Sequence, residues 1–126
     1  MIEVEEKFFD FKLFKNHLYP PKVYNMASRF HKENTLIKNL DVLLAGRTLQ
    51  DMIIVDNRSA NYCDHLLNGL PISDYKGEKS DTGLYKLCDY LMQRILPAQD
   101  VRQVIKEDFI DAVLIPQIYN LKINNC

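Results

Sequence analysis

The sequence predicts an α/β fold built on a parallel sheet with helices on both of its faces. Met52–Val55 is a short run of mostly β-branched residues between Asp51 and Asp56, which is typical of a strand buried on both sides. Two stretches farther along, Leu84–Ile95 and Val101–Val113, repeat apolar residues at helical spacing. Buried strands followed by amphipathic helices favour a sheet covered by helices.

The elements before this strand are predicted from periodicity and from breaking residues. Phe9, Phe11 and Leu13 alternate with polar residues, which predicts a strand over Lys7–Phe14. After Pro20-Pro21, a helix is expected over Val23–Phe30. Asn39 is placed to cap a short helix through Leu44, which Gly46 would end.

The elements after the strand follow the same rules. Leu70–Ile72 is a second short strand, and Pro71 restricts it to an edge or to the first residues of a strand. The first amphipathic helix is stopped by Pro97, and the second ends before Pro116. We expect both helices to pack on the sheet, and residues 113–126 stay an unassigned tail.

Composition excludes several classes of protein. A chain of 126 residues forms one domain at most, and a net charge of −1 gives no overall attraction to nucleic acid or to an anionic membrane. Cys63, Cys88 and Cys126 are widely spaced, which fits a reducing compartment better than a disulfide framework or a zinc site. No apolar run approaches the ~18 residues of a membrane span, and the acidic start does not fit a presequence. We therefore expect neither a nucleic-acid nor a membrane partner.

The residues with chemical potential directly follow the buried strand. In open α/β sheets, ligands bind at the carboxyl ends of the strands, where Asp56 and Asn57 are expected. A carboxylate and an amide oxygen are ligands that Mg²⁺ accepts, together with water and substrate phosphate. The alternative is a plain turn in which both side chains bond to the local backbone. His17, His31 and His65 are scattered over predicted loops without metal-ligand spacing.

Several segments together resemble the small C-terminal-domain phosphatases, also called NLI-interacting-factor-like phosphatases, a haloacid-dehalogenase-like family. The resemblance covers roughly residues 5–112, and the order and gaps of its motifs match the family. The matching segments are Phe11–Lys15, Leu36–Leu40, Gly46–Leu49, Ile53–Ser59, Asn68–Ile72 and Asp81–Leu87.

The resemblance implies a three-layer α/β fold and a Mg²⁺-dependent phosphatase acting on serine and threonine phosphates of proteins. In this family the first aspartate of an Asp-x-Asp-x-Thr motif attacks phosphorus, and the second acts as general acid and base. No Asp-x-Asp occurs in the 126 residues. We therefore expect the carboxyl-terminal half of such a domain, lacking its first strand and inactive as written.

The resemblance also assigns roles to individual residues. Lys38 would neutralise charge on the transferred phosphoryl group, and Asn57 would bind magnesium with Asp56 beside it. Lys15 stands where the family commonly has a substrate-binding arginine, and it offers a point charge instead of a bidentate fork. Arg58-Ser59 replaces the Ser-Pro of the family, which changes the loop after the strand.

A binding function without catalysis is the alternative, as in the import-receptor subunit of the mitochondrial inner-membrane presequence translocase, which shares this domain. The expected partner is a phosphoprotein or peptide in either case. The nucleus or cytoplasm is favoured as the location, with the mitochondrion as the alternative. Tyr85, Tyr90 and Phe109 lie on or beside the helical stripes, and core packing is expected for them.

Overall fold

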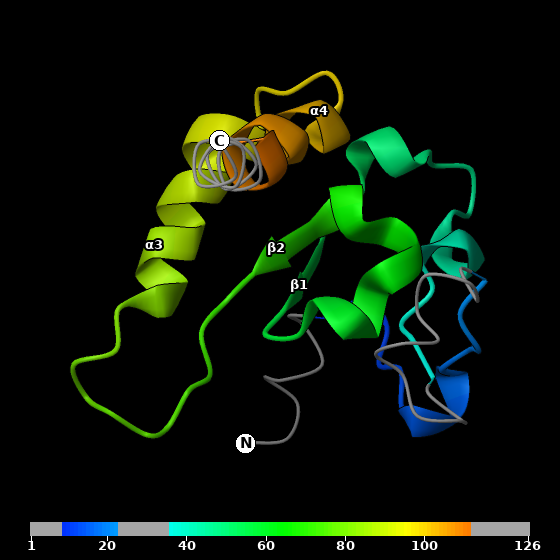
Figure 1. The fold of residues 1–126 in the computed structure, drawn as a ribbon, viewed down its shortest axis with the longest axis horizontal. Helices are drawn as coiled ribbons and strands as arrows, with labels where there is room; N and C mark the ends of the chain where they lie inside the picture. Colours follow the sequence, from blue (N-terminus) through cyan, green and yellow to red (C-terminus); the bar gives the residue numbers. More distant parts are fainter. Residues whose placement is uncertain (1–8, 23–35, 112–126) are drawn as a thin grey trace, which may run out of the picture.

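The structure is a computed structural model that describes residues 9–22 and 36–111 of the chain (Figure 1). Within these residues it contains the strands and α-helices β1 (Ile54–Asp56), β2 (Gly69–Pro71), α3 (Gly83–Tyr90) and α4 (Val101–Ile105). Both helices continue as wider π-helical turns, over Leu91–Ile95 after α3 and over Lys106–Asp111 after α4. The remaining helical segments are 3-10 turns at Lys15–His17, Leu40–Leu43, Leu49–Asp51 and Ser59–Asn68.

The two strands pair in parallel at the centre of the molecule (Figure 1). Their register is Ile54 with Gly69, Val55 with Leu70 and Asp56 with Pro71. Both strands were predicted, and each lies within two residues of its expected place. A parallel pair flanked by helices makes the fold class α/β, as the sequence predicted.

The segment Ser59–Asn68, called the crossover segment below, carries the chain from β1 back to β2. Parallel strands need a connection of about a dozen residues or more. Because this connection is near that minimum, the segment turns tightly in 3-10 geometry, with non-helical backbone at Tyr62 (φ −134°, ψ 34°) and His65 (φ −134°, ψ 42°). The Tyr62 ring lies so close to Gly69 that a Cβ built on that glycine would be 1.8 Å from Tyr62 Cε2.

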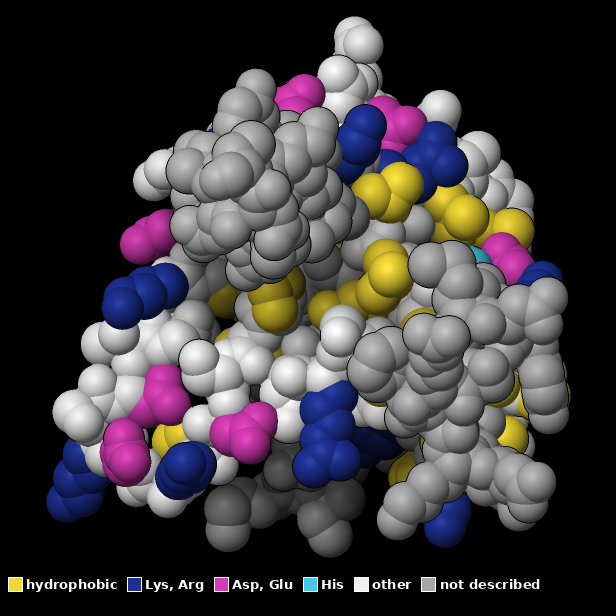
Figure 2. All heavy atoms as spheres, viewed as in Figure 1, with side chains coloured by type: hydrophobic (Ala, Val, Ile, Leu, Met, Phe, Trp, Pro, Cys, Tyr) yellow, Lys and Arg dark blue, Asp and Glu magenta, His cyan; other side chains and the backbone are white. Residues whose placement is uncertain are grey.

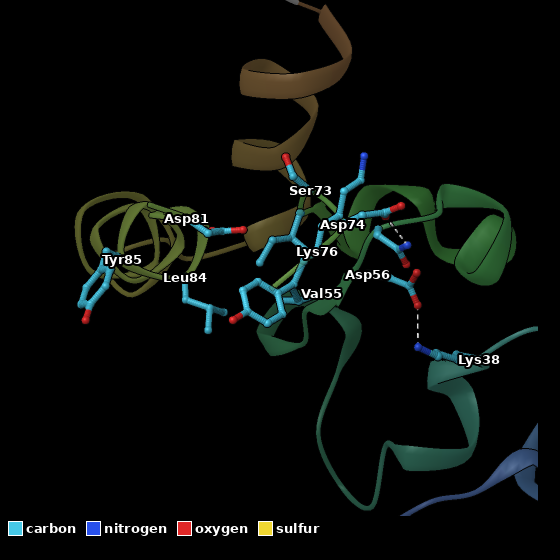
Figure 3. A pocket seen from close by; sticks show the side chains of 13 residues that line it. Lys38, Val55, Asp56, Ser73, Asp74, Lys76, Asp81, Leu84 and Tyr85 are labelled. Carbon is cyan, nitrogen blue, oxygen red and sulfur yellow. Dashed lines mark hydrogen bonds and ion pairs between the residues drawn. The ribbon is translucent and has the colours of Figure 1, made fainter. Parts of the chain in front are cut away.

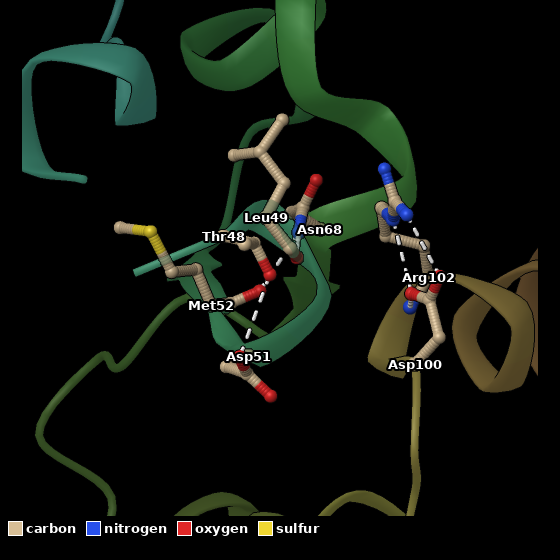
Figure 4. A network of polar contacts seen from close by, with 7 residues as sticks. All are labelled: Thr48, Leu49, Asp51, Met52, Asn68, Asp100 and Arg102. Carbon is tan, nitrogen blue, oxygen red and sulfur yellow. Dashed lines mark hydrogen bonds and ion pairs between the residues drawn. The ribbon is translucent and has the colours of Figure 1, made fainter. Parts of the chain in front are cut away.

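Side-chain caps define several helix starts. Asn39 accepts a hydrogen bond from the backbone N–H of Asp41 at 2.8 Å, which confirms the predicted cap of the short helix at residues 40–43. Gly46 adopts a left-handed φ of 84°, which favours glycine and fits the predicted end of that segment. Asp100 caps α4 through the N–H of Arg102 and also pairs with its guanidinium (Figure 4).

The two helical segments contact each other through a small polar and aromatic cluster. The rings of Tyr90 and Phe109 meet edge to face at 5.4 Å, but both side chains are half-buried and lie outside the buried core, so the predicted core packing is met only in part. Asp108 accepts hydrogen bonds from Arg94 at 2.9 and 2.8 Å and from the Tyr90 hydroxyl at 2.8 Å. Burial, together with Asp108, raises the pKa of Tyr90, so its phenol stays protonated and keeps donating at neutral pH.

The core lies between β2, the crossover segment and α4. α4 packs against the crossover segment and the turn at Leu49–Asp51, whereas α3 faces β2 across a cavity of about 250 Å³. The expected packing of both helices directly on the sheet is therefore wrong in detail. The buried apolar side chains are Ile37, Leu40, Met52, Tyr62, Leu70, Val101 and Ile105.

Three predictions need correction. The described part of the predicted strand at residues 7–14 forms no strand, and Phe9, Phe11 and Leu13 are exposed. An alternating pattern needs a partner strand to satisfy its backbone, and none of the described segments supplies one. Tyr85 is exposed and does not pack in the core, and His65 is buried in the crossover segment and does not lie on a surface loop.

Other predictions fall on residues that the structure does not describe. These are the helix at residues 23–30, the tail at residues 113–126 and the end of the second amphipathic helix. Within residues 9–22 and 36–111, no helix has the length and apolar character to cross a membrane.

Candidate active site at the ends of the strands

A cavity of about 770 Å³ opens at the carboxyl ends of β1 and β2 (Figure 3). One side carries the polar side chains of Lys38, Asp56 and Asp74, and the other side is formed by the start of α3, with Leu84 and Tyr85. Charged side chains of both signs gather over the loop after β2, while hydrophobic ones show near the middle of the same face (Figure 2). The carboxyl ends of parallel strands are the usual place for a ligand in an open α/β sheet.

Lys38 and Asp56 form an ion pair inside this cavity. Lys38 Nζ lies 2.5 Å from Asp56 Oδ2, although the two residues come from different segments of the chain. The Asp56 side chain is only 3% exposed, whereas the Lys38 side chain is 50% exposed. The ammonium is therefore held by a buried carboxylate and still reaches the open part of the cavity.

The second oxygen of Asp56 is also occupied. Oδ1 accepts a hydrogen bond from the backbone N–H of Arg58 at 2.8 Å and one from Asn61 Nδ2 at 3.0 Å. Burial by itself would raise the pKa of Asp56, but the hydrogen bonds from Lys38, Arg58 and Asn61 outweigh burial and lower it. Asp56 is therefore ionised at neutral pH, with Lys38, Arg58 and Asn61 donating to it.

Asn57 follows Asp56 and points to a different partner. Its Nδ2 donates to Asp74 Oδ1 at 2.5 Å, and both side chains line the cavity. Asp74 comes three residues after β2, and Asn57 directly follows β1. The end of each strand therefore contributes one of these two oxygen-bearing side chains. Sequence reasoning missed Asp74. The sequence held one signal for it, namely a polar residue shortly after the second predicted strand. Parallel pairing brings such a residue to the same edge of the sheet as Asn57.

The residue after Lys38 is held by a buried polar contact with the crossover segment. Asn39 Oδ1 lies 3.0 Å from His65 Nε2, and both side chains are buried. Because Asn39 Oδ1 is an acceptor, Nε2 of His65 must carry the proton in this contact. His65 therefore has a structural role next to Lys38 that the sequence did not suggest.

Comparison with known proteins decides the family. Residues 4–102 match the profile of the NLI interacting factor-like phosphatases, which is well over half of the chain. The chain belongs to this family. This confirms the resemblance that its motifs indicated, and it places the parallel pair and its helices within a haloacid-dehalogenase-like α/β family.

Three relatives illustrate the similarity to small phosphatases of this family. CTD small phosphatase-like protein 3 of Caenorhabditis elegans is 27% identical over 95 residues, covering 71% of this chain and 32% of the relative. The human carboxy-terminal domain RNA polymerase II polypeptide A small phosphatase 1 is 30% identical over 86 residues, with 68% and 31% covered. CTD small phosphatase-like protein 1 of C. elegans is 35% identical over 77 residues, with 61% and 15% covered. The chain thus spans about a third or less of the length of these relatives.

The structure brings only some of the site residues predicted from the family resemblance together in the cavity. Lys38, Asp56 and Asn57 all line the cavity. Lys15 lies in the exposed turn at Lys15–His17 and is not among the residues that line it. The substrate contact predicted for Lys15 stays a prediction.

The family implies a magnesium ion, and the donor groups of the cavity fit one in part. Asn57 and Asp74 supply an amide and a carboxylate at the cavity wall, and Mg²⁺ is usually held by one or two such groups plus water and phosphate. Asp56 is a poorer ligand, because both of its oxygens already accept hydrogen bonds. Within the described residues, no group of three or more His, Cys, Asp and Glu side chains is arranged to hold a metal.

The hydrogen bonds to Asp56 predict a loss of stability in acid. A carboxyl whose pKa is lowered by folding stabilises the folded state above its unfolded pKa, about 3.9, and loses this effect as the pH falls through the folded pKa. We expect Asp56→Asn to lower the free energy of unfolding by about 1–3 kcal/mol at pH 7, and by less at pH 3, where the carboxyl of the unfolded chain is largely protonated. Urea unfolding at both pH values measures the difference. The exposed Asp41→Asn serves as control, and an equal cost of Asp56→Asn at pH 3 and pH 7 would contradict the assignment.

Proposed function

We propose that residues 5–112 are the carboxyl-terminal portion of a Mg²⁺-dependent protein serine/threonine phosphatase domain with a three-layer sheet. The observation that carries this proposal is the Lys38–Asp56 pair at the ends of two parallel strands, inside a cavity large enough for a phosphorylated side chain. Family membership supports the phosphatase character of the domain. The expected substrate is a phosphorylated protein or peptide.

Lys38 is the residue that would contact the phosphoryl group. An ammonium carries three N–H donors, and the contact with Asp56 Oδ2 uses one of them. The other donors are available on the exposed side of the cavity, where they would neutralise charge that develops on the phosphoryl oxygens. Asp56 then acts by holding the ammonium in place. This role replaces the direct metal contact that the sequence suggested for it.

Magnesium, when bound, would supply further positive charge next to the phosphoryl group. Asn57 would hold it through its amide oxygen, with the carboxylate of Asp74 beside it. Because Asp74 accepts a hydrogen bond from Asn57 Nδ2, the amide oxygen of Asn57 is the end that stays free for the ion. Asp74 therefore orients the Asn57 oxygen even without touching the metal.

A binding function without hydrolysis is the second candidate. The observation in its favour is that no Asp-x-Asp occurs in the 126 residues, so these residues contain no such pair for the nucleophile and the general acid. The cavity would then hold a phosphorylated segment through Lys38 without cleaving it. Both candidates require recognition of a phosphoserine, and they differ in whether the complete domain releases phosphate.

Binding of a blocked phosphoserine, N-acetyl-phosphoserine amide, tests the proposal. In calorimetry with Mg²⁺ present, we expect it to bind the chain at least tenfold more tightly than N-acetylserine amide, because the ammonium of Lys38 meets the phosphate. Lys38→Met should remove most of this preference, whereas Lys106→Met, which removes an exposed lysine outside the cavity, should keep it.

Because the 126 residues contain no Asp-x-Asp, neither candidate predicts phosphate release by this chain alone. Release that appears when a segment with the family's Asp-x-Asp-x-Thr motif is supplied, and that depends on Lys38, supports the phosphatase. Binding without release in the presence of that segment supports the binding function. Equal affinity for the phosphorylated and unphosphorylated compounds would refute both, provided that circular dichroism shows the chain to be folded.

A further inference from the structure

Asn61, in the crossover segment, contacts both members of the Lys38–Asp56 pair. Its side-chain Nδ2 donates to Asp56 Oδ1 at 3.0 Å. Its backbone carbonyl accepts the N–H of Lys38 at 2.7 Å. Lys38 and Asp56 belong to separate segments, so one residue of a third segment is hydrogen-bonded to both.

The backbone contact fixes where the Lys38 side chain starts. A lysine stem is long and flexible, so the position of its ammonium depends on the placement of its Cα. The preceding residue, Ile37, is fully buried and exchanges two backbone hydrogen bonds with Tyr19, at 3.0 and 2.7 Å. Asn61 holds the next N–H along the chain, so the Lys38 segment is bonded at consecutive residues to two different parts of the protein.

The side-chain contact fixes the direction of the carboxylate. The N–H of Asn61 donates to the carbonyl of Arg58 at 3.0 Å, which closes a turn beside Asp56. Within this turn, the Arg58 N–H and the Asn61 amide both donate to Oδ1 of Asp56. Since these donors occupy Oδ1, the other oxygen, Oδ2, is directed at the Lys38 ammonium.

We propose that Asn61 is a positioning residue that keeps the Asp56 carboxylate turned toward Lys38 and so sets the place of the Lys38 ammonium in the cavity. The effect on phosphoserine binding rests on the proposed function, whereas the effect on Asp56 itself does not. Asn61 touches neither the proposed phosphate nor the proposed metal, and it acts through Asp56 and Lys38.

The mobility of the Lys38 side chain, measured at constant pH by NMR relaxation of its ε-methylene group, tests the direct effect. Asn61→Leu keeps the backbone carbonyl and a similar volume but removes the amide donor to Asp56, so the Lys38 ε-methylene group should become more mobile than in the wild type. Asn61→Gln keeps an amide donor and should restore part of the difference.

Binding of N-acetyl-phosphoserine amide to the same variants tests the consequence. We expect about tenfold weaker binding for Asn61→Leu, equivalent to one hydrogen bond to a charged group, and an intermediate value for Asn61→Gln. Gln50→Leu, which removes an exposed amide outside the crossover segment, should change neither the mobility of Lys38 nor the affinity.

The outcomes separate this inference from the proposed function. A Lys38 mobility that is unchanged in folded Asn61→Leu, or changed equally in Asn61→Gln, overturns the positioning role. If the mobility rises as expected but the wild-type chain does not bind the phosphoserine compound, the positioning role holds and the proposed function fails. If Asn61→Leu does not fold, the comparison of Asn61→Gln with the wild type decides in the same way.

Discussion

Replacing Asn68 with leucine is expected to lower the free energy of unfolding by about 2–4 kcal/mol. Asn68 is 2% exposed, and its Nδ2 donates to the carbonyl of Leu49 at 2.6 Å and to that of Met52 at 2.8 Å (Figure 4). Leucine has nearly the same size but no donor, so both carbonyls lose a hydrogen bond, although the Leu49 carbonyl keeps the N–H of Met52 at 3.5 Å. A buried polar group without a partner costs about 1–3 kcal/mol, and a lost hydrogen bond costs about 0.5–1.5 kcal/mol.

Urea unfolding monitored by circular dichroism measures this effect. The matched control is Thr48→Val in the same region, which removes an exposed contact of 3.4 Å to Asp51 and should change stability by less than about 0.5 kcal/mol. A loss below about 1 kcal/mol in Asn68→Leu would show that these carbonyls find other partners or that the chain does not close around Asn68.

The expected effect is large because Asn68 connects the approaches to both strands. It is the last residue of the crossover segment, directly before β2, and its two acceptors lie in the turn that leads into β1. One side chain thereby fixes the start of β2 against the approach to β1. The register that brings Asp56 and Asn57 to the same edge as Asp74 depends on that start.

Local patterns were enough to predict the elements and part of the site. The β-branched run before Asp56, the glycine and proline around Leu70 and the stripe beginning at Leu84 each carry their own signal, and all three formed as strands or helix. Lys38, Asp56 and Asn57 line the cavity, and the sequence singled them out because the motifs that contain them are contiguous.

Pairings between distant residues were not visible in those patterns. Nothing local shows that Asp56 accepts from Lys38 and Asn61, or that Asn57 faces Asp74, since these contacts depend on how the crossover segment turns. The described part of the strand predicted at residues 7–14 formed no strand, because alternation describes a face, and a strand forms only where a partner pairs with it. The burial of His65 likewise follows from tertiary packing alone.

The exposed apolar face of α3 and of the turns that follow it has the same origin. Leu84, Met92 and Leu96 lie on or beside the stripe that predicted the helix, yet they are exposed in the described part of the chain. Periodicity indicates that a face is apolar, and it does not identify the segment that covers it.

Replacing Gly69 with alanine is expected to lower the free energy of unfolding by about 3 kcal/mol. Its φ of −95° is open to any residue, so backbone strain does not contribute. The cost comes from space, because the new Cβ would lie 1.8 Å from Tyr62 Cε2 and 2.5 Å from Cδ2 and Cζ. Tyr62 is buried in the tight turns of the crossover segment and has little room to move, and overpacking of this kind typically costs about 1–3 kcal/mol or more.

A double-mutant cycle with Tyr62→Ala shows whether the ring is the cause. Tyr62→Ala alone should cost about 3–5 kcal/mol through the cavity that it leaves, but it also makes room for the new methyl group. The double variant should therefore be more stable than the sum of the two single effects by about 2 kcal/mol. Gly77→Ala is the control, since it has open space around its Cβ and a left-handed φ of 82°, which costs about 1–2 kcal/mol without any coupling to Tyr62. Strict additivity of Gly69→Ala and Tyr62→Ala would mean that β2 does not lie against the crossover segment, and the cavity at the strand ends would then lose the wall that carries Asp74.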